Sequence, residues 1–125
     1  MKTSRENLVR LKQFNVNHKR KRVSQLDAMI AEFERMAEEL DAQIIAEETK
    51  AGITDQSHFA YPTFAKAARL RRDNLRISQA ELIQQREQAL AELKALEEDL
   101  RKAEALEMRD RGNRNAEPSS RAAAG

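Results

Sequence analysis

Hydrophobic residues alternate with spacings of three and four along two long stretches of the chain. In the first stretch these positions are Val23, Leu26, Ile30, Phe33, Ala37, Leu40 and Ile44. In the second stretch a seven-residue repeat is formed by Leu75, Leu82, Ala89, Leu96 and Ala103, which Leu93 and Leu100 join. This spacing places the apolar side chains on one face of a helix, as in the seam of a coiled coil. We therefore predict one helix over about residues 4–51 and a second over about residues 64–111.

Helix-ending signals fall where the pattern stops. Thr3 with Glu6 fits a capping box, and Gly52 fits the residue that follows a helix C-terminus. Thr63 is a candidate N-cap after Pro62, and Gly112 is a candidate stop for the second helix. Two arms of nearly equal length around one interruption, residues 52–63, predict an all-α fold in which residues 1–112 form an antiparallel coiled-coil hairpin. Residues 113–125 are predicted to be a disordered tail.

Two features depart from a uniform seam. Leu8 and Leu11 lie on a shifted stripe, which predicts a change of phase around residues 14–20. In the second arm the seam positions nearest the interruption carry polar side chains, namely Arg72, Gln79 and Arg86. The half of the hairpin next to the interruption is therefore expected to be the less well packed.

Charge is distributed in blocks that favour a fold-back. Residues 2–22 hold eight Lys or Arg and one acid, whereas residues 27–48 hold eight Asp or Glu and one base. If the chain reverses near residues 57–58, position i faces roughly 115 minus i. The basic residues 66–76 then face the acidic part of the first arm, whereas a parallel dimer would place residues 19–22 against their own copies. Such pairs select orientation more than they add stability, and they favour a monomeric hairpin.

Composition narrows the function classes. The 125 residues are 35% charged and include no Cys, and no apolar run approaches the roughly 18 residues of a membrane span. The N-terminus has no apolar segment of the secretion-signal kind, so we expect a cytoplasmic protein. His18 and His58 are 40 residues apart and match no metal-ligand spacing, and no phosphate-binding glycine loop occurs. We therefore expect a protein that is not an enzyme and has no catalytic residues, cofactor or metal.

The sharpest charge feature is the basic run Lys19, Arg20, Lys21 and Arg22, which follows His18. Consecutive helical positions cannot form one flat face, so one interpretation is a solvated band. A second interpretation is docking onto an acidic protein partner, and a third, given less weight, is binding to nucleic acid or an anionic membrane. Because no aromatic residues are interleaved for base stacking, nucleic acid is not expected as a partner.

The interruption and the residue after it concentrate aromatic side chains: Phe59, Tyr61 and Phe64 are three of the five aromatic residues in the chain. They could plug the seam where the helices reverse, or they could form an exposed contact cluster for a partner. Both interpretations stay open, and different rings could serve each purpose.

Three segments of the chain resemble the FliJ family, the small coiled-coil component of the flagellar type III export apparatus, in its alphaproteobacterial form. They are residues 4–14 (SRENLVRLKQF) with the basic run after them, residues 33–40 (FERMAEEL), and the more specific residues 58–75 (HFAYPTFAKAARLRRDNL). The resemblance covers about residues 4–110.

The resemblance implies a non-enzymatic antiparallel hairpin, similar to the paired helices of the rotary ATPase γ stalk. It implies partners in the export ATPase ring, the membrane export gate and export chaperones, at the cytoplasmic side of the inner membrane at the flagellar base. On this basis residues 19–22 are expected to engage the ATPase, and Phe59, Tyr61 and Phe64 are expected to face the gate. The alternatives are a generic coiled-coil adaptor that dimerises through residues 93–106, or a basic helical protein that binds nucleic acid or a membrane surface.

Overall fold

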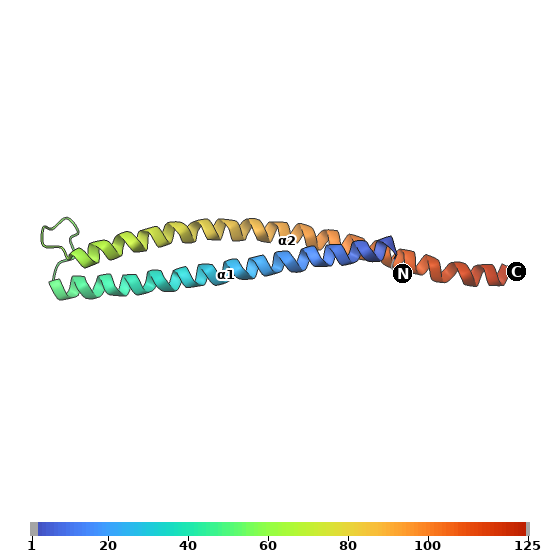
Figure 1. Cartoon of the computed structure of the whole chain (residues 1–125), viewed down its shortest axis with the longest axis horizontal. Helices are drawn as coiled ribbons and strands as arrows, with labels where there is room; N and C mark the ends of the chain where they lie inside the picture. The colour runs from blue at the N-terminus through green and yellow to red at the C-terminus, as the bar shows by residue number, and fades with distance from the viewer. Residues whose placement is uncertain (1–2, 125) are drawn as a thin grey trace. The chain divides into compact units, whose positions relative to one another are not determined.

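The chain is built from two long helices joined by an ordered loop. In the computed structural model, α1 comprises Ser4–Ala51 and α2 comprises Thr63–Ala124 (Figure 1). The structure describes the backbone of residues 3–124 and the side chains of residues 3–115, and this part of the chain has no strand. The prediction of an all-α helical hairpin is confirmed.

Both predicted ends of α1 are confirmed by their hydrogen bonds. At the N-terminus the amide of Glu6 donates to Thr3 Oγ1 (3.1 Å), and the amide of Thr3 donates to Glu6 Oε2 (3.2 Å). This reciprocal pair is a capping box. At the C-terminus Gly52 has φ 70°, and the amide of Ile53 donates to the Glu48 carbonyl (3.2 Å). The six-to-one bond with a left-handed glycine is a Schellman motif, which ends the helix and turns the chain.

The second helix differs from the prediction at both ends. The Lys66 amide donates to the Pro62 carbonyl (3.1 Å), so Pro62 occupies the N-cap position and Thr63 is the first helical residue. Gly112 does not stop α2, which continues through it. A glycine in a helix costs only about 1 kcal/mol relative to Ala, and Gly112 does not have the positive φ of a helix-ending glycine. Residues 113–115 are helical, and the rest of the predicted disordered tail lies outside the residues whose side chains are described.

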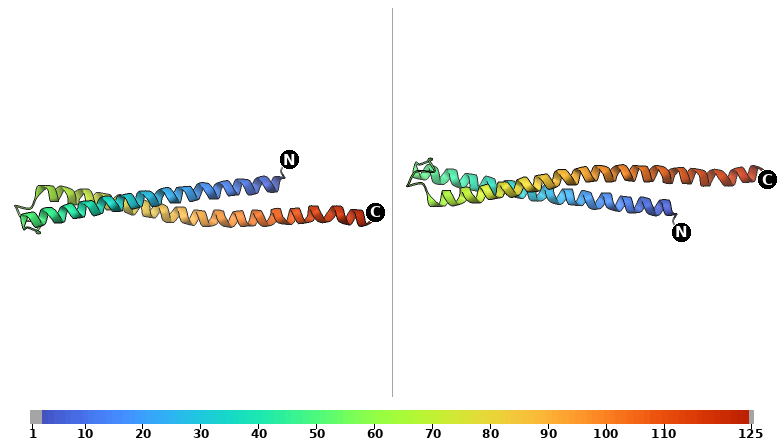
Figure 2. Two further views of the ribbon diagram at one scale, coloured as in Figure 1. Left: turned by 90° about the horizontal axis from the view of Figure 1, so that it is seen from below. Right: turned by 90° about the horizontal axis from the view of Figure 1, so that it is seen from above.

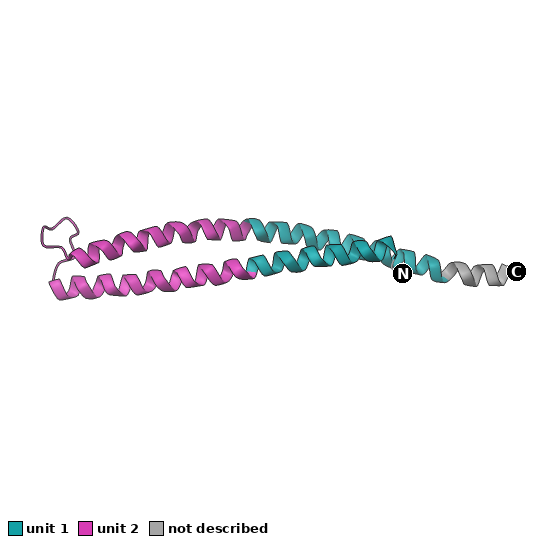
Figure 3. Ribbon diagram, in the orientation of Figure 1, with its two compact units in different colours: residues 1–23, 88–125 teal, residues 24–87 magenta. Residues whose placement is uncertain are grey.

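The chain divides into two compact units (Figure 3). Unit 1 contains residues 1–23 and 88–125, and unit 2 contains residues 24–87. Unit 2 includes the loop, residues 52–62, which joins α1 to α2 at one end of this unit in both views of Figure 2.

Unit 2 contains an apolar core between antiparallel helical segments. Its centre is a cluster of Leu40, Ile44 and Ala68, against which Leu75 packs. Leu26, Ala37, Ala65 and Leu82 are also buried. Leu26, Ala37, Leu40, Ile44 and Leu82 are seam positions expected from the heptad pattern, so this part of the predicted core is confirmed. Ala65 and Ala68 extend the same spacing toward the loop and were not predicted.

The polar seam positions of unit 2 are satisfied rather than loosely packed. Arg72 Nη1 donates to Asp41 Oδ1 (2.8 Å), and the side-chain Nε2 of Gln79 donates to Glu34 Oε2 (2.9 Å). Arg86 pairs with Asp27. The expectation that this half is the less well packed is wrong, because each polar side chain reaches a partner on α1, Leu82 between them is buried, and Leu75 packs partly buried against the core cluster.

Unit 1 continues the same heptad phase at its N-terminal end. Val16 is fully buried and Val9 is half-buried, whereas Leu8 and Leu11 are exposed. Val9 and Val16 precede Val23 by multiples of seven, so the predicted change of phase is wrong. The stripe looks interrupted in the sequence because Lys12 and Lys19 occupy the seam positions that alternate with these valines.

These two lysines form ion pairs with α2 inside unit 1. Lys12 Nζ lies 4.0 Å from Asp99 Oδ2, and Lys19 Nζ lies 2.5 Å from Glu92 Oε2. The α2 side of the same unit is apolar, with Ala89, Leu100 and Ala103 buried. In each unit one helix therefore supplies an apolar stripe, while the other alternates apolar side chains with polar ones that reach across the seam.

Candidate interaction site at the helix-joining loop

The loop that joins the helices is held in shape by its own polar groups. Asp55 Oδ1 accepts hydrogen bonds from the Ser57 amide (3.0 Å) and the Ser57 hydroxyl (2.7 Å), and these bonds lower the pKa of Asp55. The amide of His58 donates to the Asp55 carbonyl (3.2 Å), and the amide of Tyr61 donates to the His58 carbonyl (3.0 Å). Asp and Ser close local turns in this way because their short side chains reach nearby backbone amides. The loop therefore presents its side chains from a defined backbone.

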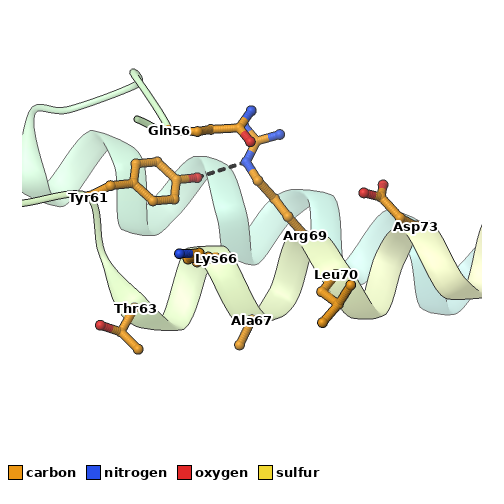
Figure 4. A pocket seen from close by; sticks show the side chains of 8 residues that line it. All are labelled: Gln56, Tyr61, Thr63, Lys66, Ala67, Arg69, Leu70 and Asp73. Carbon is orange, nitrogen blue, oxygen red and sulfur yellow. Dashed lines mark hydrogen bonds between the residues drawn. The ribbon is translucent and has the colours of Figure 1, made fainter. Parts of the chain in front are cut away.

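A three-residue network ties the loop to both helices. Tyr61 donates its hydroxyl hydrogen to Glu48 Oε2 (2.8 Å), near the end of α1. Arg69, in the second turn of α2, donates from Nε to the Tyr61 hydroxyl oxygen (2.8 Å) and from Nη2 to Glu48 Oε2 (2.9 Å). Figure 4 shows the phenol hydroxyl directed toward Arg69. One side chain from each of the three segments thus meets at the base of the loop.

Electrostatics keep this network charged at neutral pH. Hydrogen bonds from Arg69 and from the Tyr61 hydroxyl hold the pKa of Glu48 below its ordinary value, despite the opposing effect of burial. Hydrogen bonds to Glu48 and to the Tyr61 hydroxyl raise the pKa of Arg69. Glu48 and Tyr61 are each only 8% exposed. Hydrogen bonds join the Glu48 carboxylate, the Tyr61 hydroxyl and the Arg69 guanidinium to one another. A buried charged pair is tolerated when it is hydrogen-bonded in this manner.

The structure separates the three predicted aromatic contacts into two kinds. Tyr61 is the plug, because its ring is buried and its hydroxyl is engaged. Phe59 is 97% exposed, and its ring stacks on His58 with 4.8 Å between centroids. Phe64, in the first turn of α2, is 55% exposed. The cap interpretation is therefore confirmed for Tyr61, and the partner-contact interpretation stays a prediction for the exposed rings of Phe59 and Phe64.

A groove of about 480 Å³ opens beside the loop, between it and the first turns of α2 (Figure 4). Its apolar part comes from Tyr61, Ala67 and Leu70, and its polar rim includes Lys66 and Asp73. The sequence pattern did not single out this groove, because Ala67 and Leu70 lie off the heptad seam. The sequence signal for this groove is Leu70, a large apolar residue at a position off the seam.

The basic run lies in α1 within unit 1, and three of its four members are already engaged. Lys19 pairs with Glu92, and Arg20 Nη2 lies 3.0 Å from Glu97 Oε2. Arg22 also has an interaction partner. Lys21 is exposed and has no ion pair in the described part of the chain. These contacts orient α1 against α2, and they reduce the free positive charge that the sequence suggested.

The described residues contain no group of three or more His, Cys, Asp or Glu side chains placed to hold a metal ion. No described helix is long and apolar enough to cross a membrane.

Comparison with protein-family models, with curated proteins and with solved structures gives no match for this chain.

Proposed function

We propose that this chain is a non-enzymatic interaction factor of flagellar type III protein export, acting between the export ATPase ring and the export gate at the inner membrane and assisting delivery of chaperones and substrates. The assignment to flagellar export is supported by the resemblance of residues 4–14, 33–40 and 58–75 to the FliJ family. The all-helical hairpin agrees with the fold that this family implies.

The observation that carries an interaction role is the exposed ring of Phe59 on an anchored loop. A large apolar side chain is costly to expose to water, and here it stands on a backbone fixed by Asp55 and by the Tyr61 network. Holding a contact residue in place before binding reduces the entropy lost on association. We therefore assign Phe59 and Phe64 to the gate side of the proposed function, with Tyr61 as the residue that holds the loop in position.

We assign the ATPase side to the basic run, and within the run to Lys21 and Arg20. Lys21 is the member that has no ion pair in the described residues, and Arg20 remains half exposed beside Glu97. Lys19 is the least available, because its ammonium group lies against Glu92. We expect Lys21→Ala and Arg20→Ala to weaken capture of the export ATPase more than Lys19→Ala does.

The deciding experiment is genetic. Deletion of this gene in its host should abolish swimming and flagellar hook and filament secretion, and the full chain supplied from a plasmid should restore both. A Phe59→Ala chain should restore them poorly although it accumulates to the normal level. A deletion strain that swims normally would overturn the flagellar assignment.

A generic adaptor that dimerises through residues 93–106 remains the alternative function. In unit 1 this segment already packs inward, with Leu100 and Ala103 buried, while Leu106 is exposed. Light scattering on the purified chain separates the two proposals. A dimer whose mass is insensitive to dilution would favour the adaptor.

A further inference from the structure

An apolar stripe runs along the outward face of α2 in unit 2, starting in the groove beside the loop. It consists of Ala67, Leu70 and Ile77, which follow one another at helical spacing. Leu70 is 64% exposed and Ile77 is 61% exposed, and both lie away from the seam that packs on α1. Large aliphatic side chains at the outermost positions of a coiled coil contribute nothing to its core, so the hairpin itself does not explain them.

The groove gives this stripe a closed end. Gln56 and Tyr61 from the loop stand beside the first turns of α2, and together with Ala67 and Leu70 they line the volume of about 480 Å³ (Figure 4). A volume of this size accommodates one large apolar side chain, while the helix face beyond the groove is open. The shape therefore suits an elongated ligand with an apolar anchor at one end.

Beside Leu70 and the groove the free charges are positive, and the exposed acid Glu81 lies one turn beyond Ile77, at the far end of the stripe. Asp73, on the rim of the groove, is paired with Arg72 (3.0 Å), and Glu48 beneath the loop is paired with Arg69 (2.9 Å). By contrast, neither Lys66 nor Arg71 has an ion pair among the described residues. A partner with carboxylates beside its apolar positions would complement these two cations, and a partner with Lys or Arg there would be repelled.

We propose that the outward face of α2, from the loop groove to Ile77, binds an acidic amphipathic helix of another protein. The partner helix places apolar residues at i, i+3 or i+4 and i+7 against Leu70 and Ile77, and one of them enters the groove. Its flanking Asp or Glu side chains pair with Lys66 and Arg71. A second copy of this chain is not the favoured occupant, because it would bring two further free cations, Lys66 and Arg71, to the contact rather than a face rich in carboxylates. The proposal stands independently of the flagellar assignment.

The test uses the purified full chain and two designed helical peptides with identical apolar positions. One peptide carries Glu at the flanking positions and the other carries Lys, and each bears a fluorophore for anisotropy. The Glu peptide is expected to bind, the Lys peptide to bind at least roughly tenfold more weakly, and salt to weaken the Glu peptide selectively. Equal binding of the two peptides, or no binding of the Glu peptide, would overturn the proposal.

Matched variants locate the contact. Leu70→Glu should weaken binding of the Glu peptide by roughly tenfold or more, whereas Ile45→Glu, at an equally exposed position (64%) on α1 in the same unit, should leave it unchanged. The double variant Lys66→Glu, Arg71→Glu should reverse the preference toward the Lys peptide. This reversal is a gain of binding that a misfolded variant could not give. Circular dichroism confirms that each variant keeps its helicity.

The remaining outcomes separate the other occupants and the proposed function. If the wild-type chain is dimeric and Leu70→Glu makes it monomeric, the face is occupied by a second copy and the proposal is wrong. Because the binding measurements need no export apparatus, a normally swimming deletion strain would overturn the flagellar assignment and leave this inference intact.

Discussion

At the scale of single residues, two aromatic side chains two positions apart have opposite roles. Tyr61 joins three hydrogen-bonding groups at the base of the loop, while Phe59 touches little besides the ring of His58. We expect Tyr61→Phe to lower the free energy of unfolding by about 1 kcal/mol, since it removes a hydrogen bond from a buried carboxylate. Phe59→Ala should change it by less than about 0.5 kcal/mol. Urea denaturation followed by circular dichroism measures both, and equal losses would contradict the separation of roles.

The Glu48 carboxylate should give the loop end of unit 2 a specific acid sensitivity. Its pKa is lowered in the folded state, first by the hydrogen bond from Arg69 and then by that from Tyr61. Its contribution to stability is therefore complete above the ordinary pKa of 4.5, and it is lost as the pH falls below that value toward the lowered pKa.

Glu48→Gln tests this linkage. The variant cannot ionise at this position, so its stability should fall less steeply between pH 5 and pH 3 than that of the wild type. Thermal melts over this pH range measure the difference. Glu47→Gln is the control, because the carboxylate of Glu47, next to Glu48 in the chain, has no ion pair among the described residues. Parallel profiles for the wild type and Glu48→Gln would show that the network does not lower the pKa of Glu48.

At the scale of the helices, two glycines with similar sequence signals behave differently. Gly52 has φ 70° and closes the Schellman motif of α1, whereas Gly112 lies within α2. At neither position would an added Cβ come within 4 Å of another part of the structure beyond the adjoining backbone, so backbone conformation decides the effect of a side chain.

Gly52→Ala is therefore expected to cost about 1–2 kcal/mol in the free energy of unfolding, since it forces a left-handed conformation on alanine. Gly112→Ala should instead raise the helical signal at 222 nm without lowering stability. The two variants are measured in one set of denaturation curves. A loss of stability in Gly112→Ala would show that this glycine ends the helix in solution.

The heptad pattern predicted much of these helices and little of the site. Regular spacing from Val23 to Ile44 identified the buried face of α1, because burial in a two-helix hairpin repeats with the turns of the helix. The loop network escaped prediction, since Tyr61 meets Glu48 and Arg69 through a turn that has no period. The phase near Val16 was misread because a lysine at a seam position looks like a gap in the stripe, although its ammonium group reaches an acid on the other helix.

At the scale of the whole molecule, the two units differ in what holds their helices together. Unit 2 buries large aliphatic residues from both helices, including Leu26, Ile44 and Leu82. In unit 1 the large buried side chains are fewer, and charged residues alternate with Val9 and Val16 along α1. Burial of apolar surface contributes more to stability than ion pairs that remain partly in water.

Amide exchange should therefore be slower in unit 2 than in unit 1. Hydrogen–deuterium exchange followed by mass spectrometry is expected to show stronger protection for residues 26–48 and 65–85 than for residues 5–20 and 92–110. Added salt should widen the difference, since unit 1 depends more on its ion pairs. Uniform protection along both helices would contradict this division.

The lysines in the seam of unit 1 contribute more to selecting the partner helix than to stability. Lys19 lies between Val16 and Val23 in the heptad sequence, and its side chain is 26% exposed while it pairs with Glu92. In Lys19→Leu an apolar side chain would take this seam position, while the carboxylate of Glu92, 45% exposed, would remain solvated. We expect protection of residues 5–20 to increase, because an apolar side chain at this position is buried more favourably than a partly hydrated ion pair.

The same substitution should weaken the selectivity for the antiparallel partner. A seam without Lys19 lacks one of the charges that disfavour packing of α1 on a second copy of itself, so Lys19→Leu is expected to form dimers at lower concentration than the wild type. Lys21→Leu, at an exposed position off the seam, is the control and should leave both protection and mass unchanged. Light scattering and hydrogen exchange on the same samples give the two readouts. If Lys19→Leu is instead less protected and remains monomeric, the ion pair to Glu92 stabilises unit 1 and does not act through selection of the partner helix.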